Sequence, residues 1–551
     1  MKLMRLKTGL FFSVLSFSWL WAQPKLPDVR PESVVMTLDE AIQIGLVNNL
    51  NLKVASMSLS EVNNQVEEGY SNLYPKVNLS SSYQRNVVSA NPFAGSSAGS
   101  LFSGLGQIGW LSYNEQARTD GDPATNPITL SDYYAKVSAG QAAAGISSNS
   151  SSNPFGVENN FNNAIAISQT LYNAAAIQGI RATEVAQSLT SATVLRAQQQ
   201  VVSQIRAAYY RVMLAREQVR VITNSMERLR ETVRDVGKTV QQGVAPRYQR
   251  LSAEVELGNL ETQLYSAQNN AELALSSLKL LVGLPAEQKI DLRATWDDLR
   301  ADGASTDALS QTEAIGVAIK QRPDLVQAQK NIELQHIQRG LTQSMGRPIL
   351  SAFGNFAYNG RVPSNRSYAQ QDANDPFKFT KERNGYFSDG YWDPSVVVGL
   401  TLSWSLYDGG ARRFQMRRND LAIERAEWQK LQAIEGIKLE VEQAMRSLGS
   451  AKQRIMSQEA NIGRAEENYR IASTRLKEGV GNQLEERQAS ELLDQSRLAY
   501  AAALFDYLIA RNAVDTAIGS LPHVAQEVAL STGAFKTNGI WKYVNRIYGL
   551  K

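Results

Sequence analysis

The sequence is internally duplicated, and this feature constrains the fold more than any other. The segment TLDEAIQIGLVNNLNL, Thr37 to Leu52, matches SQTEAIGVAIKQRPDL, Ser310 to Leu325, at an offset of 273 residues. Each segment opens with a hydroxyl residue that is followed three positions later by glutamate, which is the pattern of a capping box at the start of a helix. Self-similarity at a constant offset indicates that the two halves fold into the same unit.

Two further markers repeat where strand pattern meets helix pattern. The offset of 273 carries Pro75 onto Pro348, and each proline stands just before a strand-like stretch. At an offset of 235, the segment ISQTLYNAA matches LSWSLYDGG, which places Asn173 on Asp408 at the start of a long helical pattern. Asparagine and aspartate are good N-cap residues. We therefore predict helix–strand junctions at these four positions.

Each long helical pattern is broken once by glycine. The stretch QQGVAP contains Gly243 and Val244, and the stretch KEGVGN contains Gly479, Val480 and Gly481, with the first glycines 236 residues apart. A glycine inside a helix costs about 1 kcal/mol relative to alanine, but it permits the backbone geometry of a tight reversal. We interpret both breaks as tips of helical hairpins.

The repeats predict a complete domain organisation. It comprises a signal peptide (1–22), a first repeat (23–285), a linker or equatorial segment (286–309), a second repeat (310–522) and a C-terminal tail (523–551). The first repeat is expected to contain strands at about 75–86 and 161–172, a long external loop at 87–159 and a helical hairpin at 174–283 with its tip at 243. The second is expected to contain strands at about 348–359 and 394–407, a loop at 361–393 and a hairpin at 409–519 with its tip at 479.

The N-terminus has the pattern of an export signal. Lys2, Arg5 and Lys7 precede the apolar run GLFFSVLSFSWLWA, which is followed by a proline-containing stretch. This is typical of a cleaved signal peptide, and the run is short for the alternative, an uncleaved membrane anchor. The chain contains no cysteine, so we expect neither disulfides nor a lipid-attachment cysteine.

The strand-like stretches alternate between apolar and polar residues. The clearest is PSVVVGLTLSWSLYD, Pro394 to Asp408, and PKVNLSSSYQ shows the same pattern. Alternation over about ten residues is typical of a transmembrane β-strand, although half-buried strands of a water-soluble sheet have it too. Past the signal there is no apolar run long enough for a membrane helix. Four strands cannot close a barrel, so membrane insertion would need two copies with eight strands or three with twelve.

The loops and helices carry signals of their own. Aromatic residues near the end of the second loop (Tyr386, Phe387, Tyr391 and Trp392) fit a membrane interface, and long loops of barrels usually face outside the cell. In the second long helix apolar residues recur every seven positions, as at Val441, Leu448 and Ile455. A seven-residue repeat predicts coiled-coil packing. A soluble rod is the alternative, but it does not explain why strands precede each helix.

In order and spacing, these duplicated motifs resemble the TolC-like outer-membrane efflux proteins over nearly the whole mature chain. The resemblance implies an α+β membrane protein: a homotrimer with a twelve-stranded β-barrel, four strands from each protomer, continued by a coiled-coil α-helical tunnel. It implies the outer membrane of a Gram-negative-type bacterium as location, with the helices in the periplasm. The tips would dock on a periplasmic adaptor (membrane fusion) protein served by an inner-membrane transporter of the RND, ABC or MFS type. The implied function is an exit duct for multidrug efflux or type I secretion.

The resemblance also implies a gate near the second tip. The family's constriction acid, six positions after the tip glycine, corresponds to Glu485, with Glu486 beside it. A second family acid corresponds to Gln488, the family's arginine two positions after the glycine corresponds to Gly481, and the first-repeat acid corresponds to Gln249. The family's closing network is therefore mostly absent, and these four acidic or amide residues remain the gate candidates.

Other classes of function lack support in the sequence. No phosphate-binding loop or catalytic constellation is recognisable, so we expect neither an enzyme nor a cofactor. The two histidines, His336 and His523, are far apart and predict no metal site. The chain carries +4, and removal of the three positive residues in the signal would leave +1, which does not favour a nucleic-acid partner. The alternative from another class is an exported coiled-coil scaffold or adhesin without a pore.

Overall fold

A computed structural model describes residues 34–88, 107–122, 125–146, 157–244, 246–301, 309–478 and 480–521. It divides into two compact units, which we treat separately: a helical unit within Met1–Val66, Arg181–Arg339 and Arg417–Lys551, and a sheet unit formed by Glu67–Ile180 and Gly340–Met416. Three earlier expectations lie outside the described residues: the signal peptide, Gly479 and the tail with His523; parts of the first long loop (89–106, 123–124 and 147–156) lie outside them as well.

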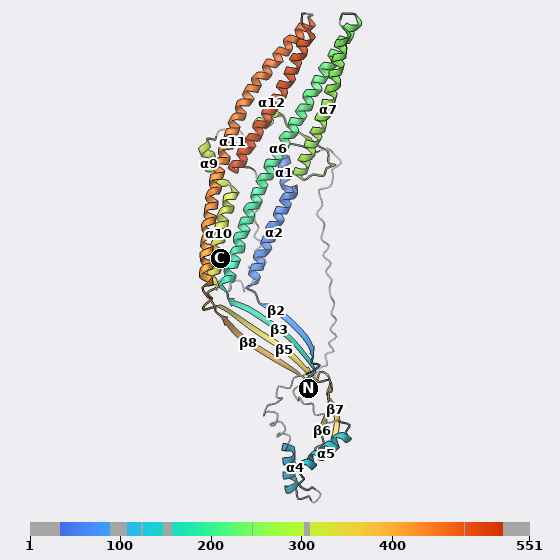
Figure 1. Cartoon of the computed structure of the whole chain (residues 1–551), viewed down its shortest axis with the longest axis vertical. Helices are drawn as coiled ribbons and strands as arrows, with labels where there is room; N and C mark the ends of the chain where they lie inside the picture. The colour runs from blue at the N-terminus through green and yellow to red at the C-terminus, as the bar shows by residue number, and fades with distance from the viewer. Residues whose placement is uncertain are drawn as a thin grey trace, which may run out of the picture. The chain divides into compact units, whose positions relative to one another are not determined.

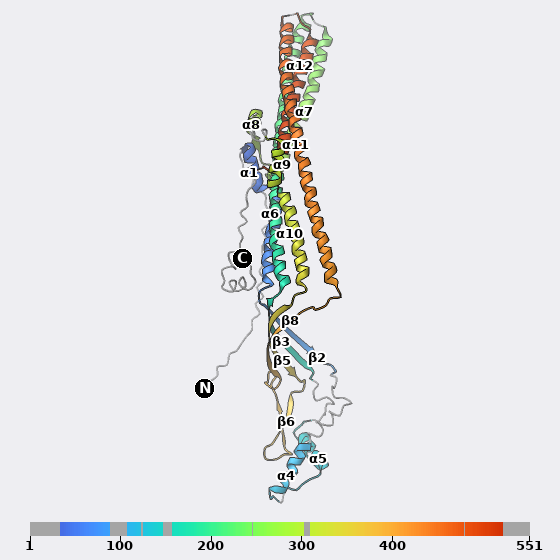
Figure 2. The same ribbon diagram turned by 90° about the vertical axis from the view of Figure 1, so that its left-hand side faces the viewer.

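The helical unit is built from two long hairpins and their shorter partners (Figure 1). The hairpins are α6 (Ala174–Gln241) with α7 (Arg247–Val282), and α11 (Ala411–Lys477) with α12 (Gln483–Ile518), which run side by side in both views (Figure 2). The shorter helices are α1 (Leu38–Asn48), α2 (Leu50–Ser71), α8 (Trp296–Ala301), α9 (Gln311–Gln321) and α10 (Pro323–Ser344). Strands β1 (Val34–Met36) and β4 (Ile290–Leu292) pair in parallel, so part of the predicted linker is a small sheet with a helix.

The two repeats begin and end their helices in the same way. Capping boxes are present at Thr37 before α1 and at Ser310 before α9, as the duplicated segments predicted. At the other end, Gly283 after α7 and Gly519 after α12 both take a left-handed conformation with φ of 76°. A residue with a β-carbon is strained there, which explains why glycine stands at both positions.

The core of the helical unit follows the seven-residue pattern. In α11 the buried residues include Ile437, Val441 and Leu448. Their counterparts 236 positions earlier, Val201, Ile205 and Val212 in α6, are also buried. The same positions of both repeats therefore face one core. No helix in the described ranges is long and apolar enough to cross a membrane.

The sheet unit contains four antiparallel strands in the order β2 (Lys76–Arg85), β3 (Asn159–Tyr172), β5 (Ile349–Val362) and β8 (Trp392–Ser403) (Figure 1). Its register repeats the sequence duplication. Lys76 pairs with Ser168 in the first repeat; adding 273 and 235 to these numbers gives Ile349 and Ser403, which pair in the second. The duplication thus extends to individual backbone partners.

Two details differ from the sequence expectations. Strand β8 ends at Ser403 rather than at 407, and the Trp404 indole instead donates to the carbonyl oxygen of Gly346 at 2.9 Å. The long loops also contain regular structure: α4 (Gln107–Thr119), α5 (Leu130–Ala143), β6 (Ser367–Gln371) and β7 (Phe379–Arg383). The Phe377 ring joins loops of both repeats, because it contacts the rings of Tyr113 and Tyr133. Such long-range aromatic packing leaves no local periodic signal.

Candidate functional site

The four-stranded sheet has one apolar face and one polar face. The register aligns Leu79, Ile165, Phe356 and Val396 in one row across the strands, on a face that also carries Val398, Leu400 and Leu402. These side chains remain 41–78% exposed. The opposite face carries hydroxyl and amide residues, among them Asn78, Ser80, Ser82, Asn162, Ser395 and Thr401. A sheet with one apolar face and one face rich in hydroxyl and amide side chains is suited to separate lipid from water.

The outer strands of the sheet have free edges. Within the described residues, the order β2-β3-β5-β8 gives β2 and β8 only one strand partner each. An exposed edge carries unpaired N–H and C=O groups, which a hydrocarbon environment does not tolerate. If the apolar face contacts lipid, both edges must be paired with strands from elsewhere.

Aromatic side chains gather at one end of the sheet. Tyr83, Phe161 and Trp392 are neighbours across the strands, with ring centroids of 4.8 Å for the first pair and 5.4 Å for the second. Tyr358 stacks on Trp392 at 5.2 Å. A β-carbon at Gly360 would lie 2.7 Å from the Trp392 ring, so glycine makes room for this cluster. Aromatic bands of this kind mark the level where a strand leaves the bilayer.

The tip of the first hairpin is a tight helix end. Gly243 has a φ of 75°, and the amide of Val244 donates to the carbonyl oxygen of Thr239 at 3.0 Å. Residue 245 lies outside the description, and α7 restarts after Pro246. The Val244 side chain is 78% exposed. The first tip therefore presents an apolar side chain to its surroundings.

The tip of the second hairpin ends its helix with the same bond. The amide of Val480 donates to the carbonyl oxygen of Arg475 at 3.0 Å, and the Val480 side chain is 70% exposed. A β-carbon on Gly481 would lie 2.7 Å from the Leu476 backbone nitrogen, so a larger residue at this position would force the backbone to move. Asn482 then caps α12 by accepting from the Leu484 amide.

The acidic residues after the second tip have opposite environments. Glu485 is about half exposed and lies 3.9 Å from Arg475 of α11. Glu486 is only 8% exposed and bonds to Tyr469 of α11. Burial raises the pKa of the Glu486 carboxyl, while Tyr469 and Arg228 oppose that effect. The family resemblance implies Glu485 as the constriction acid, and the structure adds that Glu486 beside it is a buried titratable group.

Of the remaining gate candidates, Gln488 is exposed on α12 and Gln249 is half-buried on α7. Gln249 lines a cleft of about 730 Å³ between α6, α7 and α12, together with Glu486. The structure therefore brings Gln249 and Glu486 into one cleft. Asn173 caps α6 by accepting from the Ala175 and Ala176 amides, and Asp408 accepts from the Gly410 and Arg412 amides.

A partly buried ion pair beside this cleft was not foreseen from the sequence. Arg228 of α6 donates to Asp494 of α12 at 2.5 Å and to the Ser490 hydroxyl at 3.2 Å. The Arg228 and Asp494 side chains are 19% and 15% exposed. The guanidinium also lies over the Tyr469 ring of α11, 5.6 Å from its centre. Arg228 thus joins the first repeat to both helices of the second hairpin.

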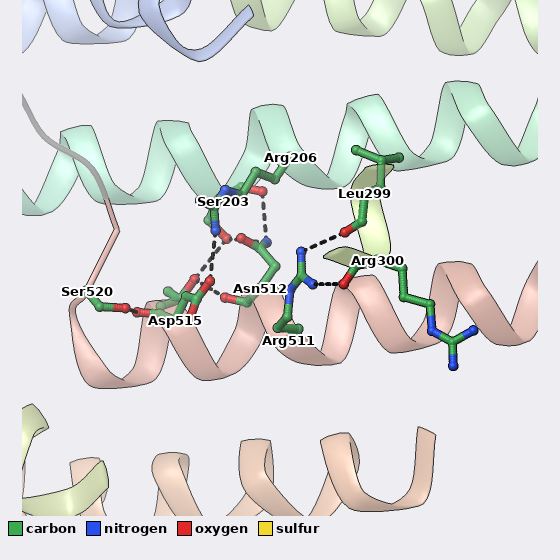
Figure 3. A network of polar contacts seen from close by, with 9 residues as sticks. Ser203, Arg206, Leu299, Arg300, Arg511, Asn512, Asp515 and Ser520 are labelled. Carbon is green, nitrogen blue, oxygen red and sulfur yellow. Dashed lines mark hydrogen bonds and ion pairs between the residues drawn. The ribbon is translucent and has the colours of Figure 1, made fainter. Parts of the chain in front are cut away.

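The C-terminal half of α12 is held by a second polar network (Figure 3). Arg206 of α6 binds Asp515 of α12 at 2.8 Å, and the Asn512 amide donates to the Ser203 carbonyl oxygen at 3.0 Å. Arg511 donates to the carbonyl oxygen of Leu299 at 3.0 Å, at the end of α8. Helix α12 is therefore fixed firmly at this end and bordered by a cleft at the other.

The described ranges contain no cluster of three histidine, cysteine or acidic side chains that could hold a metal ion. The surfaces that the structure offers are instead two helical tips, a charged cleft and a two-faced sheet.

Comparison with known proteins gives two kinds of similarity. Residues 314–520 match the family model described as outer membrane efflux protein. A search of curated proteins gave no match. Among solved structures, the Campylobacter jejuni CmeC outer membrane channel has 16% identity and a TM-score of 0.59, covering 88% of this chain and 85% of that one.

Two other solved structures are similar to the same degree. The outer membrane protein VceC of Vibrio cholerae has 15% identity and a TM-score of 0.58, with 88% of this chain and 96% of that chain covered. The open state of the MtrE outer membrane channel of Neisseria gonorrhoeae has 13% identity and a TM-score of 0.56, with 90% and 94% covered. At such low identity these matches establish the fold, and they confirm the TolC-like α+β fold predicted from the duplicated sequence.

Proposed function

We propose that the chain is a member of the outer membrane efflux protein family, whose model matches residues 314–520, and that three copies form the exit duct of a tripartite pump. The observation that carries the proposal is the sheet with one apolar face and two free edges. Three copies pool twelve strands and close these edges; the choice of three rather than two comes from the family. A pore-less scaffold or adhesin would leave this face and both edges unexplained.

The duplication specifies how the edges would join. Within the chain, Ile165 of β3 pairs with Phe356 of β5 across the boundary between the repeats. The offsets of the duplication give the equivalent pair between copies. Adding 235 to 165 gives Leu400 of β8, and subtracting 273 from 356 gives Tyr83 of β2 in the next copy. Both side chains lie on the apolar face. The same register places Thr401 opposite Ser82 of the next copy, on the polar face.

Disulfide trapping tests this register. Because the chain has no cysteine, the double variant Ser82→Cys/Thr401→Cys contains only the introduced pair. Opposed β-carbons in a sheet are about 4.5–5.5 Å apart, close to the spacing that a disulfide spans. We expect covalent dimers and trimers on a non-reducing gel. The control Ser82→Cys/Ser403→Cys is diagonal, at about 7–8 Å, and should cross-link far less. Absence of cross-links in both variants would contradict the closed barrel.

We place the adaptor contact at the two tips. Val244 and Val480 are exposed and equivalent, so a trimer would present six similar apolar tips to a periplasmic adaptor protein coupled to an inner-membrane transporter of the RND, ABC or MFS type. Val244→Asp and Val480→Asp should abolish co-purification with a co-expressed cognate adaptor. The control Ser457→Asp alters an exposed residue in the middle of α11 and should leave it unchanged. Retained binding in both tip variants would exclude the tips.

We place the gate in the same region. Glu485 is the candidate for the constriction, because three exposed carboxylates around one axis attract cations. Arg228 and Asp494 hold α12 against the first repeat, beside the buried Glu486. Gln249 lines the same cleft, and Gln488 stays exposed on α12. This ion pair supplies a closing contact in a chain that lacks the arginine and second acid of the family.

A further inference from the structure

One ion pair between the two helices of each hairpin recurs at equivalent positions of both repeats, but with the charges exchanged. In the first hairpin Arg230 of α6 lies 3.6 Å from Glu261 of α7. Adding 236 to both numbers gives Glu466 of α11 and Arg497 of α12, which lie 3.2 Å apart. The offset of 236 therefore predicts which residues of two neighbouring helices face each other, even where the side chains differ between the repeats.

Helix α6 of the first repeat meets helix α12 of the second repeat within the chain. Arg206 binds Asp515 at 2.8 Å with side chains 16% and 12% exposed, and the hydroxyls of Ser203 and Thr516 are 3.1 Å apart (Figure 3 shows the first pair). In a ring of alternating repeats, the equivalent junction joins α11 of one copy to α7 of the next. The offset of 236 identifies the residues that would meet there.

We propose that Glu442 and Leu439 of α11 face Lys279 and Leu280 of α7 in the next copy. At the offset of 236 these four positions correspond, in the order given, to Arg206, Ser203, Asp515 and Thr516. Leu439 is 56% exposed and Leu280 is 69% exposed in the isolated chain, as expected of residues covered only on assembly. Glu442 and Lys279 carry opposite charges, reversed relative to Arg206 and Asp515. This inference rests on the trimer proposed above and names the surface that builds it.

The same relation recurs closer to the tips. Within the chain, Arg487 of α12 lies 3.4 Å from Glu256 of α7. Their equivalents are Leu251 of α7 and Leu492 of α12, which are 49% and 48% exposed. At both levels a polar contact inside the chain thus corresponds to a pair of exposed leucines, one on each side of the junction between copies.

The charge reversal favours contact between unlike repeats. Within each chain Arg206 and Asp515 already bind each other, so the faces left for other copies are α7 with Lys279 and α11 with Glu442. Only contact of an α11 face with an α7 face brings these opposite charges together, whereas two α7 faces or two α11 faces bring like charges together. Head-to-tail contacts of this kind generate closed rings.

Cross-linking across the helical junction tests the surface. In Leu280→Cys/Leu439→Cys the introduced sulfurs occupy positions equivalent to hydroxyls 3.1 Å apart, so we expect covalent dimers and trimers. If this pair fails while Ser82→Cys/Thr401→Cys cross-links, the trimer exists and the helical surface is refuted. If neither pair cross-links, the trimer itself is refuted and this inference falls with it.

Charge reversal in the same cysteine background tests the ordering. Lys279→Glu should lower the yield of covalent species several-fold, and adding Glu442→Lys should restore most of it. The control Lys289→Glu makes the same charge change at an exposed position just after α7 and should have no effect. Equal yields in Lys279→Glu and Lys289→Glu would overturn the ordering role.

Discussion

Loss of the Arg228–Asp494 ion pair should loosen the tip half of α12. The burial of the two side chains sets the free energy that this loss costs. Removing one partner of a fully buried pair costs about 3–5 kcal/mol, whereas an exposed pair contributes about 0.2–1 kcal/mol. Arg228 and Asp494 retain 19% and 15% exposure, so we place Arg228→Gln between these limits at about 2 kcal/mol. That free energy corresponds to an approximately 30-fold increase in the opening equilibrium.

A single cysteine on α12 measures this opening. Ala489 is 3% exposed, so Ala489→Cys should react with a water-soluble thiol reagent only when α12 moves away from its neighbours. We expect Arg228→Gln to accelerate the reaction about 30-fold, in line with the 2 kcal/mol estimate. Asp494→Asn should act similarly, and the double variant should fall well short of the product of the two effects, because each removes the same interaction.

The matched control breaks an exposed pair on the adjacent helix. Arg470 binds Glu467 within α11, and both side chains are more than half exposed. Arg470→Gln should leave the reaction rate unchanged, because exposed pairs stabilise little. If Arg228→Gln and Arg470→Gln behave alike, the Arg228 contact does not hold α12, and the assigned closing contact is wrong.

Three further predictions concern single groups. Burial raises the pKa of Glu486, so ionisation of this carboxyl destabilises the packed state as pH rises. Glu486→Gln should therefore increase the heat resistance of the trimer at pH 8, and the gain should vanish near pH 4. No gain at pH 8 would refute this prediction. Gly399→Ala places a β-carbon 2.8 Å from the Phe353 ring and should cost about 1–3 kcal/mol, measured as a lower dissociation temperature; adding Phe353→Ala should restore it. Glu485→Gln should weaken block of single-channel current by divalent cations, and unchanged block would remove Glu485 from the pore.

The repeated elements were predictable because their signals are local. Alternation identified β2 and β8, and a hydroxyl residue followed by glutamate identified the helix starts at Thr37 and Ser310. Each signal spans only a few residues and appears twice, so each copy supports the other. The register of β2 with β3 and of β5 with β8 then follows the same offsets.

The contacts that join the two repeats were not predictable in the same way. Arg228 and Asp494 are 266 positions apart, and nothing near either residue shows which helix it will face. Likewise, Glu485 and Glu486 look alike in the sequence, and only packing against Tyr469 buries the second. Helices α4 and α5 were missed because their aromatic contacts involve Phe377 of the other loop.

The most direct test of the account is the electrical conductance of the purified protein in a planar lipid bilayer. We predict that detergent-extracted trimers insert and produce discrete current steps. We also predict that trimers of the Ser82→Cys/Thr401→Cys variant still conduct after their disulfides have formed, because each disulfide joins neighbouring strands without crossing the lumen. Trimers that insert stably into the bilayer but never conduct, even with Arg228→Gln, would contradict a duct and favour a pore-less scaffold.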